Sequence, residues 1–172
     1  HEGYPGHHVY NALLEQALVR ERGWREYSVY PLFSPQSLIA EGTANYGIDM
    51  AFPGEARTTF ERDSLFPIAG LNPSLAERNA RVREVIDDLN YARNEVARRY
   101  LDGAIDSAGA RAEMQRLWLS TPEAAAKTVR FIDGYRSYVI NYNLGRDLVA
   151  DCVKGHGSTP EARCGAFRAN LS

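Results

Sequence analysis

The segment that most constrains this chain is His-Glu-Gly-Tyr-Pro-Gly-His-His at positions 1–8. It holds three of the four histidines of the chain, and Glu2 directly follows the first of them. Neutral imidazoles combined with a carboxylate form the ligand shell of many catalytic zinc sites, in which a water molecule takes the remaining position. In the His-Glu-x-x-His metalloproteases the adjacent glutamate accepts a proton from that water. The segment therefore predicts a zinc site with Glu2 as the general base.

The spacing of the histidines differs from that of His-Glu-x-x-His, in which two histidines lie four residues apart on one helical face. Here His7 and His8 follow His1 after six and seven residues. In a straight helix, seven residues separate two Cα atoms by about 10 Å. Pro5 breaks or bulges such a helix, and a bulge could draw His7 back towards His1. The alternative is that the histidines only decorate a helix terminus.

A third ligand is offered by Glu41, within Ile-Ala-Glu-Gly-Thr-Ala-Asn-Tyr at 39–46. Ser-Pro at 34–35 supplies an N-cap and a first-turn proline, which predict the start of a helix running to about residue 52. Glu41 then lies about two turns inside this helix and projects sideways towards a metal held by the first segment. Asn45, on the same face, is a candidate acceptor for the ring N–H of a metal-bound histidine. The alternative is that both residues belong to a solvated polar stripe.

Most of the remaining sequence has apolar residues at helical intervals. The expected helices cover about 7–22, 55–69, 73–101, 108–119, 122–154 and 160–170, with a possible interruption at Asp133-Gly134. No segment alternates with a period of two, so the predicted fold class is an all-α multi-helix bundle with few or no strands. No linker is visible, and we expect a single helical catalytic domain over residues 1–172. Without an initiator Met, this domain resembles the C-terminal part of a longer chain.

The long helix near 73–101 has one apolar and one charged face. The apolar stripe, which we expect to be buried, comprises Val82, Val85, Ile86, Leu89, Val96, Ala97 and Tyr100. The charged face includes Arg78 and Arg81 and is expected to meet solvent. A basic face without exposed aromatics is weak evidence for nucleic acid, and a net charge of −2 gives no general attraction to nucleic acid or anionic lipid. No apolar run approaches the roughly 20 residues of a membrane span.

Tyr135, Tyr138, Tyr142 and Arg146 would share one face of a continuous helix. A tyrosine hydroxyl can donate to the oxyanion that develops when water attacks a carbonyl, and Arg146 can hold a carboxylate with two hydrogen bonds. The alternative is that these aromatic residues pack in the core.

The two cysteines, Cys152 and Cys164, flank a loop that contains two glycines and a proline. A disulfide across this loop would favour a periplasmic or secreted location. Two isolated buried thiols are an equally good reading of the sequence.

Taken together, His-Glu-x-x-Pro-Gly-His-His at 1–8 and Glu-Gly-x-Ala-x-Tyr at 41–46 resemble the bacterial family described as domain of unknown function 885. The resemblance also covers Tyr-Asn-Leu-Gly at 142–145 and is faint elsewhere. It implies a mostly helical zinc peptidase of the gluzincin type. Carboxypeptidase Taq-like and thimet oligopeptidase-like enzymes carry His-Glu-x-Gly-His, and equating the Gly-His pairs implies that His7 is the second ligand, with His8 in reserve. The resemblance also favours Tyr142 among the tyrosines.

The resulting prediction is a zinc-dependent hydrolase that cleaves peptide bonds. Zinc is held by His1, His7 and Glu41, Glu2 is the general base, and Tyr142 steadies the oxyanion. The expected substrate is a peptide or a small amide. An amidohydrolase acting on a non-peptide amide would use the same residues, whereas a helical interaction module with a degenerate site would bind no metal. A less favoured reading has the amine and ring of His1 chelating copper.

Overall fold

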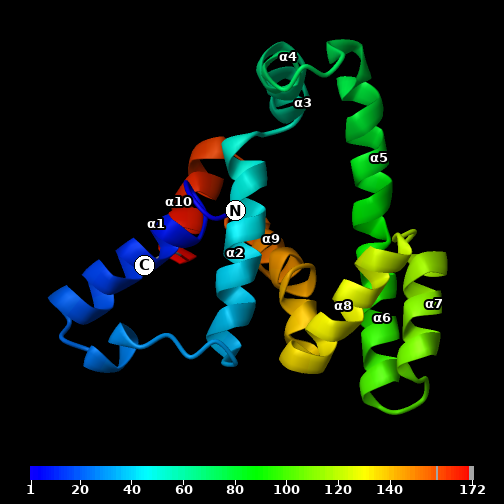
Figure 1. Ribbon diagram of the computed structural model, residues 1–172. Coiled ribbons are helices and arrows are strands. Elements are labelled where there is room, and N and C mark those ends of the chain that lie inside the picture. Colours follow the sequence, from blue (N-terminus) through cyan, green and yellow to red (C-terminus); the bar gives the residue numbers. More distant parts are fainter. Residues whose placement is uncertain (158, 171–172) are drawn as a thin grey trace. The chain divides into compact units, whose positions relative to one another are not determined.

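We describe residues 1–157 and 159–170 from a computed structural model of the chain. The longer α-helices are α1 (His7–Leu14), α2 (Pro35–Ala51), α5 (Ala76–Asp88), α6 (Asn90–Leu101), α7 (Ser107–Leu117), α8 (Pro122–Tyr135), α9 (Leu144–Gly155) and α10 (Pro160–Asn170) (Figure 1). Shorter helical segments are Glu15–Glu21, Arg25–Ser28, α3 (Ala56–Phe60), Glu61–Leu65, α4 (Phe66–Ile68), Pro73–Leu75 and Arg136–Asn141. These residues contain no strand, which confirms the predicted all-α class. None of their helices is both long and apolar enough to cross a membrane.

The chain divides into two compact units. Unit 1 comprises His1–Pro53 and Ile140–Ser172, and unit 2 comprises Gly54–Val139. Unit 1 therefore joins the two ends of the sequence, whereas unit 2 is one continuous stretch. No linker in the sequence indicated this division, and a single catalytic domain over residues 1–172 stays a prediction.

Unit 1 is built around the contact between α2 and α9, which lie side by side (Figure 1). A Cβ atom on Gly42 of α2 would overlap the backbone of Gly145 in α9, and a Cβ on Gly145 would overlap the carbonyl of Leu38. Only glycine allows this close approach of two backbones. Helices α1 and α10 complete the core, whose buried residues are Tyr10, Ala40, Tyr46, Val149, Ala150, Val153 and Phe167.

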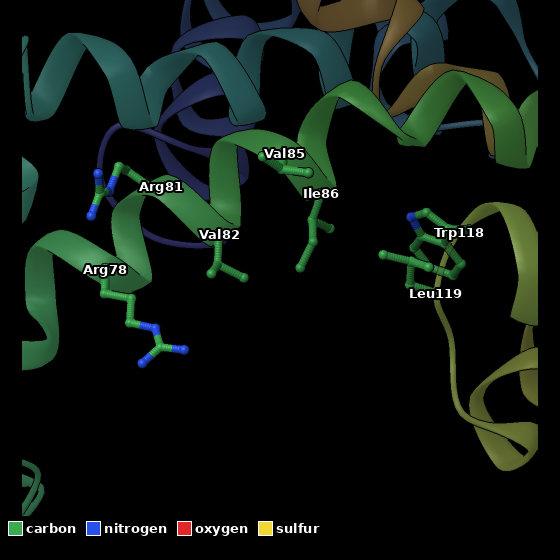
Figure 2. A pocket seen from close by; sticks show the side chains of 7 residues that line it. All are labelled: Arg78, Arg81, Val82, Val85, Ile86, Trp118 and Leu119. Atoms are coloured by element: carbon green, nitrogen blue, oxygen red, sulfur yellow. The ribbon is translucent and has the colours of Figure 1, made fainter.

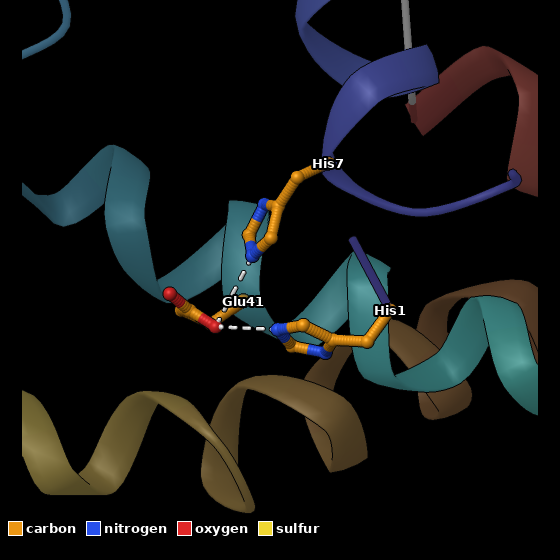
Figure 3. Close-up of side chains that lie close together, drawn as sticks. All are labelled: His1, His7 and Glu41. Atoms are coloured by element: carbon orange, nitrogen blue, oxygen red, sulfur yellow. Dashed lines mark ion pairs between the residues drawn. The ribbon is translucent and has the colours of Figure 1, made fainter. Parts of the chain in front are cut away.

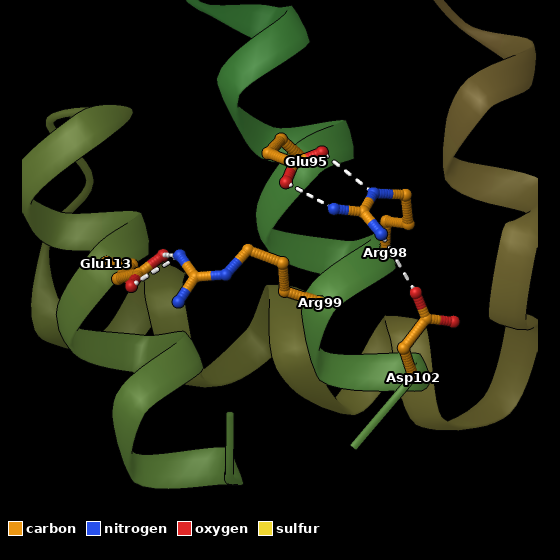
Figure 4. Close-up of polar contacts among 5 residues, drawn as sticks. All are labelled: Glu95, Arg98, Arg99, Asp102 and Glu113. Atoms are coloured by element: carbon orange, nitrogen blue, oxygen red, sulfur yellow. Dashed lines mark hydrogen bonds and ion pairs between the residues drawn. The ribbon is translucent and has the colours of Figure 1, made fainter. Parts of the chain in front are cut away.

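In unit 2, α7 packs against both α6 and α8. The buried residues of these three helices are Val96, Ala97, Ala110, Met114, Ala125, Val129 and Ile132. Nη1 of Arg99 lies 2.8 and 2.7 Å from the two carboxylate oxygens of Glu113 and joins α6 to α7 (Figure 4). Arg98, in contrast, bridges Glu95 and Asp102 on the exposed surface of α6, where ion pairs contribute little to stability.

The apolar stripe of the long helix is buried only in its second half. Val96 and Ala97 of α6 are buried, but Val82, Val85 and Ile86 of α5 are exposed, so the prediction for these three residues is wrong. The physical reason is that α7 packs against α6, whereas no described helix covers this face of α5.

The helix expected at 122–154 is interrupted, but not at the glycine in Asp133-Gly134. It ends at Tyr135, because Arg136 has a φ of 55° in the left-handed region. A 3₁₀ segment and a turn follow before α9 begins at Leu144. No continuous helix therefore carries the tyrosines, and the shared face predicted for residues 135–146 is wrong.

Both cysteines are exposed, and they are not joined in a disulfide. Cys152 lies on α9 and Cys164 on α10. The structure therefore contains neither the disulfide nor the buried thiols that the sequence suggested.

Candidate metal centre

Residues 1–6 form a loop that folds back on the start of α1, where the sequence predicted a bulged helix. The amide of His7 donates to the carbonyl of His1 at 2.8 Å, and the amide of His8 donates to the carbonyl of Glu2 at 3.0 Å. The loop contains a cis peptide bond between Tyr4 and Pro5. Gly6 is buried at the crossing point, where a Cβ would overlap the carbonyl oxygen of His1. The loop thus closes the six-residue interval and brings the first histidine beside α1.

Glu41 approaches this loop from the middle of α2 and is 8% exposed. Its Oε2 atom lies 3.3 Å from Nε2 of His1 and 3.4 Å from Nε2 of His7 (Figure 3). The two imidazole rings meet edge to face, with their centroids 4.7 Å apart. One donor atom from each of the three residues lies within 4.8 Å of the other two. We call His1, His7 and Glu41 the metal triad, because nitrogen and carboxylate donors this close together can hold one metal ion.

The orientation of the His1 ring is fixed from its other side. Nδ1 of His1 lies 3.0 Å from Oδ1 of Asn45, whose side-chain amide donates to the carbonyl of Tyr142 at 2.9 Å. Because Oδ1 only accepts, Nδ1 of His1 carries the proton in the neutral ring and Nε2 presents its lone pair to the triad. This is the contact that the sequence suggested for Asn45. It links α2, the loop and the turn before α9.

The carboxylate of Glu41 also affects the proton affinity of His1. The hydrogen bond from the imidazole to Glu41 raises the pKa of His1, and partial burial of the ring opposes this only in part. The negative charges of Glu41 and Glu2 and the contact with Asn45 act in the same direction as the hydrogen bond. The triad is therefore a site that attracts positive charge.

Glu2 and His8 lie outside the triad. The Glu2 side chain is 86% exposed, and its Oε1 atom is 3.9 Å from Nε2 of His1. This carboxylate therefore stands at the solvent edge of the triad, within reach of a water molecule that contacts both groups. His8 is exposed and is absent from the group of donor atoms. Of the two candidates for the second histidine, the structure brings His7 to Glu41.

Tyr142 meets the site through its backbone, because its carbonyl accepts the hydrogen bond from Asn45. The side chain is half-buried. The other two tyrosines of the predicted stripe contact each other, with the ring centroids of Tyr135 and Tyr138 5.9 Å apart. Phe131 stacks on Tyr135 at 4.6 Å, so these two tyrosines belong to an aromatic cluster of unit 2.

Sequence reasoning missed Tyr30, which lies before α2 in a segment that also holds Trp24, Tyr27 and Phe33. Its hydroxyl is 2.9 Å from Oγ of Ser37, one turn before Glu41 on the same helix. Burial raises the pKa of Tyr30, its bond to Ser37 opposes this, and the charge of Glu41 raises the pKa further. The signal that could have identified Tyr30 is its place in an aromatic segment directly before the helix that carries the predicted ligand Glu41.

No family model, curated protein or solved structure matches the chain. The case for a function therefore rests on the geometry of the triad and the chemistry of its donors.

Proposed function

We propose that this protein is a zinc-dependent hydrolase that cleaves peptide bonds. The observation that carries the proposal is the meeting of His1, His7 and Glu41, which come from a loop, from α1 and from α2. A buried carboxylate facing two imidazole nitrogens is costly unless a positive charge, from a metal ion or a protonated imidazole, lies beside it. Two histidines and one glutamate are also the ligand set of zinc peptidases, which keep a fourth position for water or substrate.

Two of the three separations between donor atoms match the spacing of ligands around a tetrahedral ion, and the third is within 4.8 Å. Zinc–nitrogen and zinc–oxygen bonds of about 2.0–2.2 Å put neighbouring tetrahedral ligands about 3.3–3.6 Å apart. Oε2 of Glu41 lies 3.3 Å from Nε2 of His1 and 3.4 Å from Nε2 of His7. The hydrogen bond between His1 and Asn45 fixes the tautomer that a metal ligand needs, as carboxylate or carbonyl partners do in other zinc sites.

In the proposed reaction, Glu2 accepts a proton from the attacking water and later passes it to the leaving amine. Its exposed position beside His1 allows it to meet both the water and the substrate. Bound zinc supplies Lewis acidity, which polarises the scissile carbonyl and lowers the pKa of the attacking water. The hydroxyl of Tyr142 donates a hydrogen bond to the developing oxyanion. The substrate is a peptide or a small amide.

Metal analysis of purified single-site variants tests this proposal. The protein should hold about one zinc ion per chain, as expected for a catalytic site with three protein ligands. His7→Ala should lose most of the zinc, whereas His8→Ala, which removes an exposed neighbour of the same chemistry, should keep it. The reverse pattern would transfer the ligand role to His8. Zinc binding at unchanged affinity in Glu41→Ala would remove Glu41 from the ligand set.

Activity assays then separate the kinds of hydrolase. A zinc-bound protein that hydrolyses members of a peptide library supports a peptidase, and hydrolysis of non-peptide amides alone supports an amidohydrolase. A protein that binds no zinc would contradict both and would favour a helical interaction module.

A further inference from the structure

Unit 2 carries a groove that has no role in the proposed hydrolysis. It lies between α5 and the end of α7 and has a volume of about 380 Å³. Its lining residues, shown in Figure 2, are Arg78, Arg81, Val82, Val85, Ile86, Trp118 and Leu119. We call it the Trp118 groove. Small-molecule sites in proteins typically have volumes of about 300–1,000 Å³, with apolar walls and a few polar groups that fix orientation.

The apolar wall on α5 is a helical stripe that meets solvent. Val85 and Ile86 stand three and four residues after Val82 and share its face of the helix. The side chains of Val82, Val85 and Ile86 are 50%, 57% and 40% exposed. Single exposed apolar residues are common, but a contiguous apolar surface in a concave site indicates binding.

The opposite wall is held in place by specific contacts. The indole N–H of Trp118 donates to Oδ1 of Asn90 at 3.1 Å. The guanidinium of Arg93 lies 5.0 Å from the centroid of the same ring. Both partners belong to α6, so the ring of Trp118 is fixed at one end of the groove before any ligand arrives. A preformed wall reduces the entropy that binding must overcome.

Leu119, the next residue, has an unusual backbone. Its φ is 52°, in the left-handed region that leucine rarely adopts, and its side chain is 68% exposed. A conformation that is unfavourable for leucine therefore presents an apolar side chain to solvent beside Trp118. Such backbone conformations cluster at ligand-binding sites.

The other end of the groove carries positive charge. Arg78 and Arg81 are neighbours on the surface of α5, three residues apart. Within residues 1–157 and 159–170, neither makes an ion pair or a hydrogen bond. Arg83, further along the same helix, differs because it binds Glu61 through Nη1 at 3.0 Å. The groove is thus lined by apolar side chains along its length and by Arg78 and Arg81 at one end (Figure 2).

We propose that the Trp118 groove binds an amphiphilic carboxylate, that is, a small molecule with an aliphatic or aromatic body and one anionic end. The carboxylate meets Arg78 and Arg81, because guanidinium groups bind carboxylates through paired hydrogen bonds. The body lies against Val82, Val85 and Ile86 and ends at Trp118 and Leu119. From Arg78 to Ile86 the helix rises by about 12 Å, so a medium-length alkyl chain spans the apolar wall.

Fluorescence titration with decanoate, below its micelle concentration, tests this proposal. The protein has two tryptophans, and a Trp24→Phe background makes Trp118 the single reporter. Decanoate should change its emission in a saturable way. Octanoate, which lacks two methylene groups, should bind up to about fifteenfold more weakly, because each buried methylene raises affinity by up to about fourfold. Decanol and decyltrimethylammonium, which have the same chain without the negative charge, should bind at least about tenfold more weakly than decanoate.

Matched variants assign the effect to the groove. The double variant Arg78→Gln/Arg81→Gln should weaken decanoate binding at least about tenfold, as expected for the loss of hydrogen bonds to a charged group. The control Arg111→Gln/Arg130→Gln removes the same charge from exposed positions of unit 2 outside the groove and should leave affinity unchanged. Val85→Glu and Leu119→Asp place a negative charge in the apolar wall and should each abolish binding, with melting temperature as the check on folding.

Several results would overturn the proposal. They are the absence of any saturable change, equal affinity for decanoate and decanol, and unchanged affinity in the Arg78/Arg81 variant. Light scattering tests whether a second copy of the chain occupies the groove. A dimer that Val85→Glu dissociates would make the groove a self-association surface. Removal of metal with a chelator should leave decanoate affinity unchanged, because no residue of the groove belongs to the metal triad. A failure of the zinc hypothesis therefore leaves this test intact.

Discussion

At the scale of single residues, Glu2 allows metal binding to be separated from chemistry. Its carboxylate lies outside the triad and is exposed. Glu2→Gln keeps the size and polarity of the side chain but cannot accept a proton from water. We expect zinc content and KM to persist while kcat falls by about 10²–10⁴-fold, the usual contribution of a general base. Metal analysis and steady-state kinetics on the same sample measure both quantities. Full activity in this variant would exclude Glu2 as the base.

Tyr142 and Tyr138 form a second comparison at this scale. An oxyanion donor acts mainly in the transition state, so Tyr142→Phe should lower kcat by about 10²–10³ and leave KM unchanged. Tyr138 is buried against Phe131 and Tyr135. Loss of its hydroxyl should instead cost on the order of 1 kcal/mol of stability and little activity. Steady-state kinetics and melting temperatures of both variants distinguish an oxyanion donor from a packed side chain. A normal kcat in Tyr142→Phe would mean that Tyr142 serves only in packing.

At the scale of elements, the position of Glu41 depends on how closely α9 approaches α2. Gly42→Ala and Gly145→Ala should each destabilise unit 1 by about 1–3 kcal/mol or more, because the added methyl group overlaps backbone atoms of the facing helix. Gly134, in α8, is the control. It is exposed and has open space around its Cβ position, so Gly134→Ala should stabilise the protein by about 0.5–1 kcal/mol.

Chemical denaturation measures these changes, and zinc titration adds a second readout. A shift of α9 should move the Asn45–Tyr142 contact that orients His1, and zinc affinity should fall with it. Equal stability of Gly42→Ala and Gly134→Ala would contradict the close packing of the two helices.

At the scale of the whole molecule, stability should depend on pH through Glu61, which binds Arg57 and Arg83 and joins the segment after α3 to α5. Burial by itself would raise the pKa of Glu61, but hydrogen bonds from Arg83 and Arg57 outweigh burial and lower it. The ionised form is therefore favoured in the folded state. Its contribution is complete above the ordinary glutamate pKa of 4.5 and is lost as pH falls through the lowered value.

Glu61→Gln tests this dependence. The variant should lose about 1–3 kcal/mol of unfolding free energy at neutral pH, and the difference from the unmodified protein should shrink as the solution is acidified below pH 4.5. Denaturation curves over a pH series measure the difference. Glu95→Gln is the control, because its partner Arg98 is on the exposed face of α6 and little change is expected. A difference that stays constant with pH would rule out the ion pair as its cause.

The sequence by itself determined the helical class and the residue types that make up the metal triad. Apolar residues at helical intervals and the Ser-Pro start of α2 predicted helices because these signals act within one or two turns. His1 and Glu41 were identified as candidate ligands by their chemical types, which do not depend on the fold. The choice of His7 over His8 came from a resemblance to other enzymes, together with the bulge expected at Pro5.

Only the tertiary structure decided how these parts meet. The loop that brings His1 to His7 depends on hydrogen bonds across six residues and on a crossing at Gly6 that no helical pattern encodes. The exposure of Val82 and Val85 depends on which helices cover α5. The contact between Gly42 and Gly145 joins segments about a hundred residues apart. Local signals fix an element because the residues that stabilise it are neighbours in sequence, whereas a site made from several elements depends on packing between distant ones.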